Sequence, residues 1–182
     1  MRVIAGLAKG HNLVAPEGIN TRPTTDKVKG SLFSMLMGSI AGANVLDLFA
    51  GSGALGIEAL SRGAEKCVFV DMSDDAVKCV KANLEHTKLS EAAEIRKSDG
   101  ISFLKGCNED FDLVFLDPPY HKGLAEEALM LISEKNILKK GGFVSVETDD
   151  GELDKAELGT LKCVKNKKYG RISLKIYQNG ID

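Results

Sequence analysis

The sequence lacks the features that mark secreted, membrane or zinc proteins. Its four cysteines lie far apart and form no C-x-x-C pair, so neither a zinc site nor a disulfide framework is indicated. No apolar run approaches 18 residues, and no secretory signal pattern opens the chain. The three histidines show no metal-ligand spacing. We therefore expect a cytoplasmic protein with reduced thiols, no bound metal and no membrane association.

The chain also lacks a strong net charge, so a nucleic-acid function cannot be argued from its total of −2. The charges are nevertheless unevenly distributed. Residues 160–178 contain six basic residues and no acid, whereas residues 147–157 carry six acids. Such asymmetry can create a basic face on a nearly neutral protein, although an ordinary solvated face would explain the same pattern.

Repeats, low-complexity segments and interdomain linkers are absent as well. A length of 182 residues suits one α/β domain with a substantial core, and 43% hydrophobic and 27% charged residues are ordinary values for a globular protein. We expect a single domain over residues 1–182, with an extension at residues 1–40 and a core at residues 41–182.

The extension shows two local patterns. Residues 1–15 contain two short β-prone pieces around Lys9-Gly10, which predict a hairpin. Residues 25–39 show apolar residues at i, i+4 spacing and predict an amphipathic helix, with Thr24 or Thr25 available as its cap.

The core alternates apolar strand patterns with helical ones. Alternation of this kind predicts a mainly parallel sheet with right-handed crossovers, closed by an antiparallel hairpin. The expected strands are residues 45–49, 67–71, 94–97, 111–116 and 143–146, followed by 161–164 and 172–176 in the hairpin. Helices are expected from residue 54 to 60, 74 to 88, 101 onward and 124 to 132.

Residues Gly51–Gly56 read G-x-G-x-x-G between a predicted strand and a predicted helix. Glycines let the backbone approach a ligand, and the helix terminus offers N–H groups. Asp71 ends the next strand, where a carboxylate accepts hydrogen bonds from ribose hydroxyls. Both a nicotinamide dinucleotide and S-adenosylmethionine contain such a ribose.

Further carboxylates favour S-adenosylmethionine. Asp47 lies four residues before Gly51, where it suits a sulfonium and an α-amino group better than a pyrophosphate. Asp99-Gly100 follows the third strand, where a carboxylate can meet the adenine amine, although Asp99 could also cap the next helix. The predicted cofactor contacts are Asp47, Phe49, Gly51, Ser52, Gly53, Asp71, Met72, Asp99 and Gly100.

The tetrapeptide Asp117-Pro118-Pro119-Tyr120 follows the apolar run at residues 113–116. Asp117 and the Pro118 carbonyl can accept the two N–H bonds of an exocyclic nucleobase amine and so orient its lone pair. The prolines restrict the backbone, and Tyr120 can stack on the base. By itself the segment could be a strand end and a turn; after the glycine motif it indicates a catalytic site.

Residues 47–63 resemble the first motif of the class I methyltransferases. Together with residues 2–6 and 22–28, they resemble more narrowly the bacterial small-subunit (16S) ribosomal RNA guanine-N2 methyltransferases of the RsmD type. The resemblance implies a seven-stranded Rossmann-like sheet with an amino-terminal hairpin and helix. It also implies methylation of a guanine N2 amine on an assembled or assembling small subunit, with Arg22 and Thr24 bordering the pocket.

Two alternatives remain at this point. A DNA adenine or cytosine amino-methyltransferase uses the same type of tetrapeptide, but no segment of the sequence is left over for a target-recognition domain that would contact DNA bases. A catalytically silent cofactor- or RNA-binding module is the other alternative, against which the intact tetrapeptide argues. We expect a monomer that acts on the small ribosomal subunit or its RNA.

Overall fold

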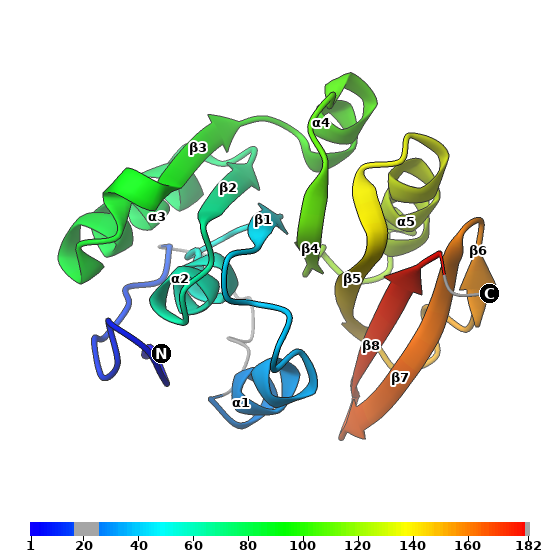
Figure 1. Cartoon of the computed structure of the whole chain (residues 1–182), viewed down its shortest axis with the longest axis horizontal. Coiled ribbons are helices and arrows are strands. Elements are labelled where there is room, and N and C mark those ends of the chain that lie inside the picture. Colours follow the sequence, from blue (N-terminus) through cyan, green and yellow to red (C-terminus); the bar gives the residue numbers. More distant parts are fainter. Residues whose placement is uncertain (17–25, 181–182) are drawn as a thin grey trace.

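An eight-stranded sheet forms the centre of the protein in the computed structural model, which describes residues 1–16 and 26–180 (Figure 1). The strand order is β3-β2-β1-β4-β5-β8-β7-β6, with the first five parallel and the last three antiparallel. The strands are β1 (Asn44–Leu48), β2 (Lys66–Asp71), β3 (Ala93–Lys97), β4 (Phe111–Leu116), β5 (Leu138–Asp149), β6 (Glu157–Leu158), β7 (Leu161–Tyr169) and β8 (Ile172–Asn179).

Five α-helices lie in the described part of the chain: α1 precedes β1 and the other four connect successive strands, and a short 3₁₀ turn (Ser90–Ala92) precedes β3. The helices are α1 (Asp26–Met35), α2 (Ala54–Ser61), α3 (Asp74–Thr87), α4 (Gly100–Gly106) and α5 (Leu124–Glu134). The mainly parallel sheet and its closing antiparallel hairpin are confirmed. No helix in residues 1–16 and 26–180 is long and apolar enough to cross a membrane.

The expected strand count was one too low, because β6 pairs only Glu157 and Leu158 with β7. Two residues are too few to produce an alternating pattern. β5 also extends beyond the apolar run at residues 143–146, since its first residues pair with β4 and its last with β8. Partners distant in sequence therefore extend a strand that local hydrophobicity does not mark.

Helix α1 ends at Met35 rather than at residue 39. Leu36 and Ile40 lie beyond the end of the helix but are still buried. The apolar spacing therefore continued past the helix because it reflects burial and not helix alone. Gly38, three residues after the end of the helix, has a φ of 96° in the following turn, where an L-residue would be strained.

Residues 1–13 reverse direction as expected, but they form a single bridge, Arg2 with Asn12, rather than two full strands. The Val3 amide donates to His11 at 3.0 Å, and the Gly10 amide donates to Val3 at 2.9 Å. Gly6 approaches the end of α2 so closely that a Cβ there would lie 1.8 Å from the Ser61 carbonyl oxygen. Contact with α2 therefore replaces part of the expected strand pairing.

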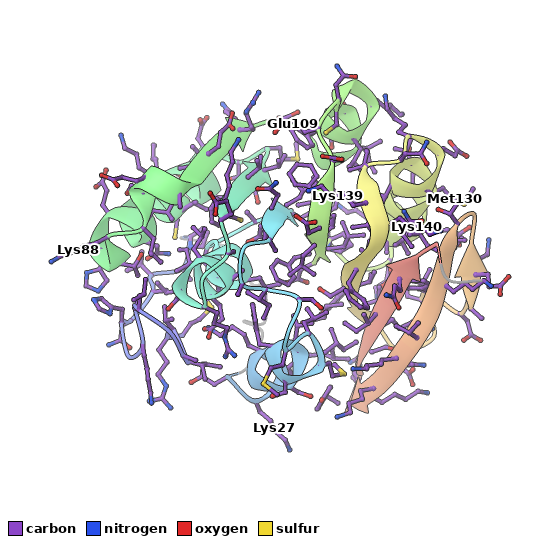
Figure 2. All side chains as sticks on the ribbon, viewed as in Figure 1. Lys27, Lys88, Glu109, Met130, Lys139 and Lys140 are labelled. Atoms are coloured by element: carbon purple, nitrogen blue, oxygen red, sulfur yellow. The ribbon has the colours of Figure 1, made fainter. Side chains whose placement is uncertain are left out.

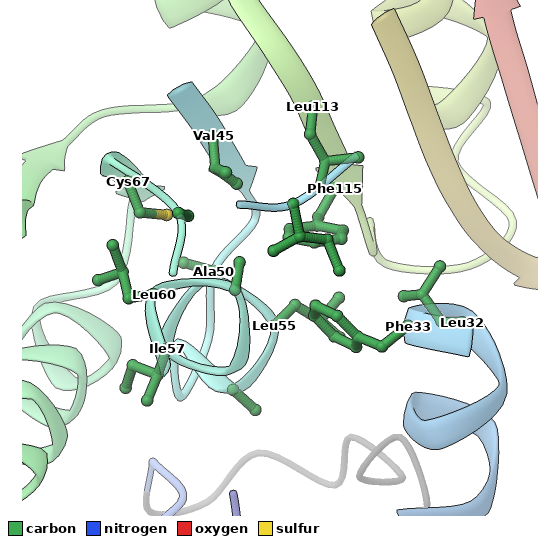
Figure 3. Close-up of a cluster of buried hydrophobic side chains, with 14 of the residues drawn as sticks. Leu32, Phe33, Val45, Ala50, Leu55, Ile57, Leu60, Cys67, Leu113 and Phe115 are labelled. Atoms are coloured by element: carbon green, nitrogen blue, oxygen red, sulfur yellow. The ribbon is translucent and has the colours of Figure 1, made fainter. Parts of the chain in front are cut away.

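Helices cover both faces of the sheet (Figure 1): α1, α2 and α3 lie on one face, and α4 and α5 on the other. Each face of the sheet carries a hydrophobic core. Figure 3 shows the core under α1, α2 and α3, in which Phe33 of α1 and Leu55 of α2 pack toward Phe115 of β4. Alternate residues of each strand enter opposite cores, as Val45 and Leu46 do. This alternation directs Asp47 toward α2.

Buried charges attach the amino-terminal segment to the core. Glu58 of α2 accepts hydrogen bonds from the Ile4 and Ala5 amides at 2.8 and 3.0 Å, and its carboxylate pairs with Lys29 at 3.2 Å and Arg62 at 2.8 Å. The side chains of Glu58 and Lys29 are fully buried. Burial lowers the pKa of Lys29, and the Glu58 charge opposes that shift. Lys27 of the same helix is exposed, and Figure 2 shows its side chain projecting away from α1.

We expect Glu58→Ala to lower the free energy of unfolding by about 3–5 kcal/mol, because it leaves the Lys29 ammonium buried without its carboxylate. Denaturation in urea would measure the change. The matched control is Lys78→Met, which removes the exposed Lys78–Asp75 pair and should cost less than about 1 kcal/mol. Equal effects of the two substitutions would contradict the assigned importance of Glu58.

Candidate active site

The predicted functional residues gather at one edge of the sheet. Strands β1 to β4 are parallel, so their carboxyl ends lie at the same edge. The glycine loop follows β1, Asp71 ends β2, Asp99 follows β3 and Asp117 follows β4. In open α/β sheets, ligands bind outside the carboxyl ends of the strands.

The three glycines of the motif have different physical roles. A Cβ at Gly56 would lie 2.3 Å from the Phe69 ring, and one at Gly53 would lie 3.2 Å from Val80, so these two glycines permit close packing of α2. Gly51 has a φ of 55°, and a Cβ there would contact nothing within 4 Å. Its backbone therefore borders open space, and it is the glycine at which a ligand can approach.

Asp71 is held in a fixed orientation at the end of β2. Its Oδ2 accepts a hydrogen bond from the Gly51 amide, and its Oδ1 accepts one from the Ser73 amide, both at 2.9 Å. Each carboxylate oxygen retains capacity for a further donor. The next residue, Met72, is 68% exposed and adds an apolar side chain to this edge.

Asp47 lies beneath the glycine loop and is only 2% exposed. Its Oδ2 accepts a hydrogen bond from the Gly56 amide at 2.9 Å, so the carboxyl group supports the turn from β1 into α2. Burial raises the pKa of Asp47 to about 7, against the opposing effect of the Gly56 hydrogen bond. The geometry thus gives Asp47 a structural role in addition to the cofactor contact expected from the sequence.

Asp99 caps α4, since its Oδ2 accepts a hydrogen bond from the Ser102 amide at 2.8 Å. The capping hypothesis is therefore confirmed, and Asp99 is exposed two residues after the carboxyl end of β3. A side chain at position 100 would clash with Phe49, because a Cβ on Gly100 would lie 2.7 Å from the Phe49 ring. The Phe49 ring thus packs on the start of α4.

Ser52, in the glycine loop, is fixed through its carbonyl, which accepts a hydrogen bond from Asn83 of α3 at 2.9 Å.

The tetrapeptide Asp117–Tyr120 continues from β4 beside the end of β5. The Tyr120 hydroxyl donates a hydrogen bond to Glu147 Oε1 at 3.2 Å. Burial raises the pKa of Tyr120, and the negative charges of Glu147, Asp117 and Asp149 add to this effect. Asp117 is partly buried, Pro118 is buried and Pro119 is exposed.

Acidic residues of β5 and the following loop hold Tyr120 and His121, and the sequence interpretation missed them. The His121 amide donates to Glu152 Oε1 at 2.6 Å, and the His121 ring lies 3.2 Å from Asp149. Glu147 follows Val146, which pairs with Leu116 immediately before Asp117. Comparison of neighbouring strand ends could have identified Glu147, which was counted only as part of an acidic run.

The basic cluster at residues 160–178 does not form a free basic face throughout. Lys168 pairs with Asp150 at 2.9 Å, and Arg171 with Asp149 at 3.4 Å. Lys175 is buried and donates to the Leu153 carbonyl. The acidic run at residues 147–157 therefore compensates much of this charge.

The predicted substrate residues and the surface hollows add nothing to the described site. Arg22 and Thr24 lie outside the described residues. Within residues 1–16 and 26–180, no group of three or more His, Cys, Asp or Glu side chains could hold a metal ion. Two surface hollows, of about 240 and 280 Å³, lie at the opposite edge of the sheet, beside Asn44 and Gly142 respectively. They are remote from the tetrapeptide.

The sheet order, the glycine loop after β1 and the antiparallel final strands define a class I methyltransferase fold. The chain belongs to the family described as Conserved hypothetical protein 95, whose model matches residues 1–178. Ribosomal RNA small subunit methyltransferase D of Haemophilus influenzae is 43% identical, with 98% of this chain and 94% of that protein covered.

Solved structures agree with this assignment. The Escherichia coli protein yhhF has a TM-score of 0.90 at 33% identity, with 100% of this chain and 99% of that chain covered. SMU.776, solved as a complex with SAH, has a TM-score of 0.67 at 17% identity, with 84% of this chain and 48% of that chain covered, and it shares the fold alone. The resemblance to the RsmD-type methyltransferases is therefore confirmed.

We expect Asp47→Asn to change how stability depends on pH. The pKa of Asp47 in the folded protein, about 7, exceeds the ordinary value of 3.8, so its contribution is greatest at low pH and is lost as the pH rises to about 7. The stability of the wild type relative to Asp47→Asn should fall across this window, by up to about 1.4 kcal/mol per pH unit. Denaturation at several pH values measures the difference, with Asp75→Asn as a surface control. Parallel profiles for wild type and Asp47→Asn would refute it.

Proposed function

We propose that this protein transfers a methyl group from S-adenosylmethionine to the exocyclic N2 amine of a guanine in small-subunit ribosomal RNA. The observation that carries the proposal is the position of Asp117–Tyr120 immediately after β4, at the same sheet edge as the glycine loop that follows the neighbouring strand β1. The name of the Haemophilus influenzae relative supports a ribosomal RNA substrate.

The residues at this edge fit the cofactor. Asp71 would bind the ribose hydroxyls with its remaining acceptor capacity, and Gly51 gives the backbone approach that a bulkier residue would obstruct. Met72 and Phe49 would provide apolar contacts for the adenine, and Asp99 would accept from its amine. Asp47, Ser52, Gly53 and Gly100 would complete the site, chiefly by shaping the loops. The bound cofactor supplies an electrophilic methyl group on a sulfonium.

The chain's own part in catalysis is to position the amine. Asp117 and the Pro118 carbonyl would accept its two N–H bonds, which directs the nitrogen lone pair toward the methyl group. The Asp117 carboxylate also stabilises the positive charge that develops on the nitrogen. The amine proton becomes acidic as methylation proceeds, so Asp117 need not remove it early.

Tyr120 would stack on the target base, an interaction worth about 1–3 kcal/mol. Pro118 and Pro119 limit the motion of the acceptors through their fixed φ. A guanine in paired RNA must first leave its stack to reach this edge. Arg22 and Thr24 are proposed as additional substrate contacts, Arg22 through a bidentate interaction with phosphate.

We further propose that the chain acts in the cytoplasm as one monomeric domain. The described elements all belong to the sheet, its covering helices or the amino-terminal segment, and none forms a separate reader of base edges. Selection of one guanine would then depend on the shape of the folded ribosomal particle.

Transfer of labelled methyl from S-adenosylmethionine to unmethylated small subunits tests the function, with naked RNA and duplex DNA as parallel acceptors. The expected product after digestion is N2-methylguanosine from RNA. Label only in DNA would replace the substrate assignment with the DNA alternative. Cofactor binding without transfer to any acceptor would favour the silent binding module.

Asp117→Ala should abolish methyl transfer, because the amine loses its carboxylate acceptor, while cofactor affinity changes little. Single-turnover transfer and calorimetric titration with the cofactor measure the two properties separately. Wild-type turnover in this variant would exclude the proposed mechanism.

Asp71→Ala should weaken cofactor binding by about 1.5–3 kcal/mol, because charge-assisted hydrogen bonds to the ribose are lost. Calorimetry measures the affinity. Asp71→Asn is the matched variant, because it keeps an acceptor for the Gly51 amide while removing the charge. Unchanged affinity in both variants would remove Asp71 from the cofactor site.

A further inference from the structure

Glu147 is a buried carboxylate beside the proposed catalytic tetrapeptide. It is 4% exposed and lies in the last part of β5, one residue after Val146. Val146 pairs with Leu116, the last residue of β4, so Glu147 and Asp117 are the residues that follow this matched pair on the two neighbouring chains. Residues at matching positions of a parallel pair project to the same face of the sheet.

The contact that gives Glu147 a function is its hydrogen bond with Tyr120. The Tyr120 hydroxyl donates to Glu147 Oε1 at 3.2 Å, across 27 positions of sequence. The hydroxyl oxygen lies on the axis about which χ2 turns the ring, so a hydrogen bond there fixes χ1 and the position of the far end of the ring. Anchoring the hydroxyl to a residue of β5 therefore fixes where the ring lies relative to the sheet, and the preference of a phenolic O–H for the ring plane favours one ring orientation.

The backbone after Tyr120 is held by the same part of the chain. His121 has a φ of 60°, which costs an L-residue conformational energy. Its amide donates to Glu152, and its ring contacts Asp149, both of which lie at or just beyond the end of β5. The loop is thus held at two successive residues, through the Tyr120 hydroxyl and through the His121 amide and ring.

From these contacts we propose that Glu147 is a positioning residue, which holds the Tyr120 ring at the place where the target guanine stacks on it. The inference rests on the proposed function, because Glu147 would help to align the guanine whose amine donates a hydrogen bond to Asp117. A misaligned ring would still allow RNA to bind through other contacts, but it would hold the amine away from the methyl group.

A double-mutant cycle of Tyr120→Phe and Glu147→Ala tests the inference, with kcat and KM measured on small subunits. We expect each variant to lower kcat about tenfold, within the range for lost base stacking, while KM and cofactor affinity stay within about twofold. The double variant should be no slower than the slower single variant, because both remove the same hydrogen bond. Kinetics are normalised to cofactor-binding sites, which separates misfolding from misalignment.

Two further variants sharpen the cycle. Glu147→Gln retains an acceptor oxygen and should recover at least part of the kcat lost in Glu147→Ala, whereas a purely electrostatic role would show no recovery. Glu134→Gln, which alters an exposed carboxylate at the end of α5, is the matched control and should behave as the wild type. Wild-type kcat in Tyr120→Phe, or losses that multiply in the double variant, would overturn the proposal.

A second readout does not depend on activity. The chain contains three tyrosines, so 3-fluorotyrosine labelling gives three fluorine NMR signals, and Tyr120→Phe identifies that of Tyr120. The signal should shift in Glu147→Ala and stay near its wild-type position in Glu147→Gln and Glu134→Gln. An unshifted signal in Glu147→Ala would refute the contact. If the wild type methylated no RNA, the proposed function would fail, while this measurement would still decide whether Glu147 orients Tyr120.

Discussion

The tight turn from β1 into α2 is the constraint on which the other parts of the structure depend. The buried Asp47 accepts from the Gly56 amide, and Gly56 leaves no room for a side chain against Phe69. Once α2 is fixed in this way, its Glu58 faces the amino-terminal segment and Lys29 of α1. Helix α2 therefore holds both the glycine loop and the amino-terminal segment.

Carboxylates dominate the functional edge, and their surroundings divide them into distinct roles. Asp47 is buried with a raised pKa and supports the loop, whereas Asp71 is partly exposed and oriented by two backbone amides. Asp117 follows β4 and Glu147 lies in the neighbouring strand β5, with Tyr120 hydrogen-bonded to Glu147. An edge of this kind suits a cationic cofactor and an amine, while the RNA phosphates require basic residues elsewhere on the protein.

Much of the fold could be predicted because its signals are local. Apolar runs bounded by glycine or polar residues gave β1, β2 and β4 nearly to the residue, since buried parallel strands read as continuous hydrophobic segments. The exceptions depend on distant partners: β6 exists because two residues pair with β7, and α1 stops at a glycine turn although the apolar spacing continues. The substrate contacts expected for Arg22 and Thr24 remain predictions.

The sequence by itself determined the glycine motif, the tetrapeptide after β4 and the order of strands and helices, because each depends on neighbouring residues. Only the tertiary structure decided which distant charges meet. It paired Glu58 with Lys29, compensated Lys168 and Arg171 with acids, and bonded Tyr120 to Glu147. The physical reason is that strand order and register bring together residues far apart in the chain, and burial then fixes which of their polar groups must pair.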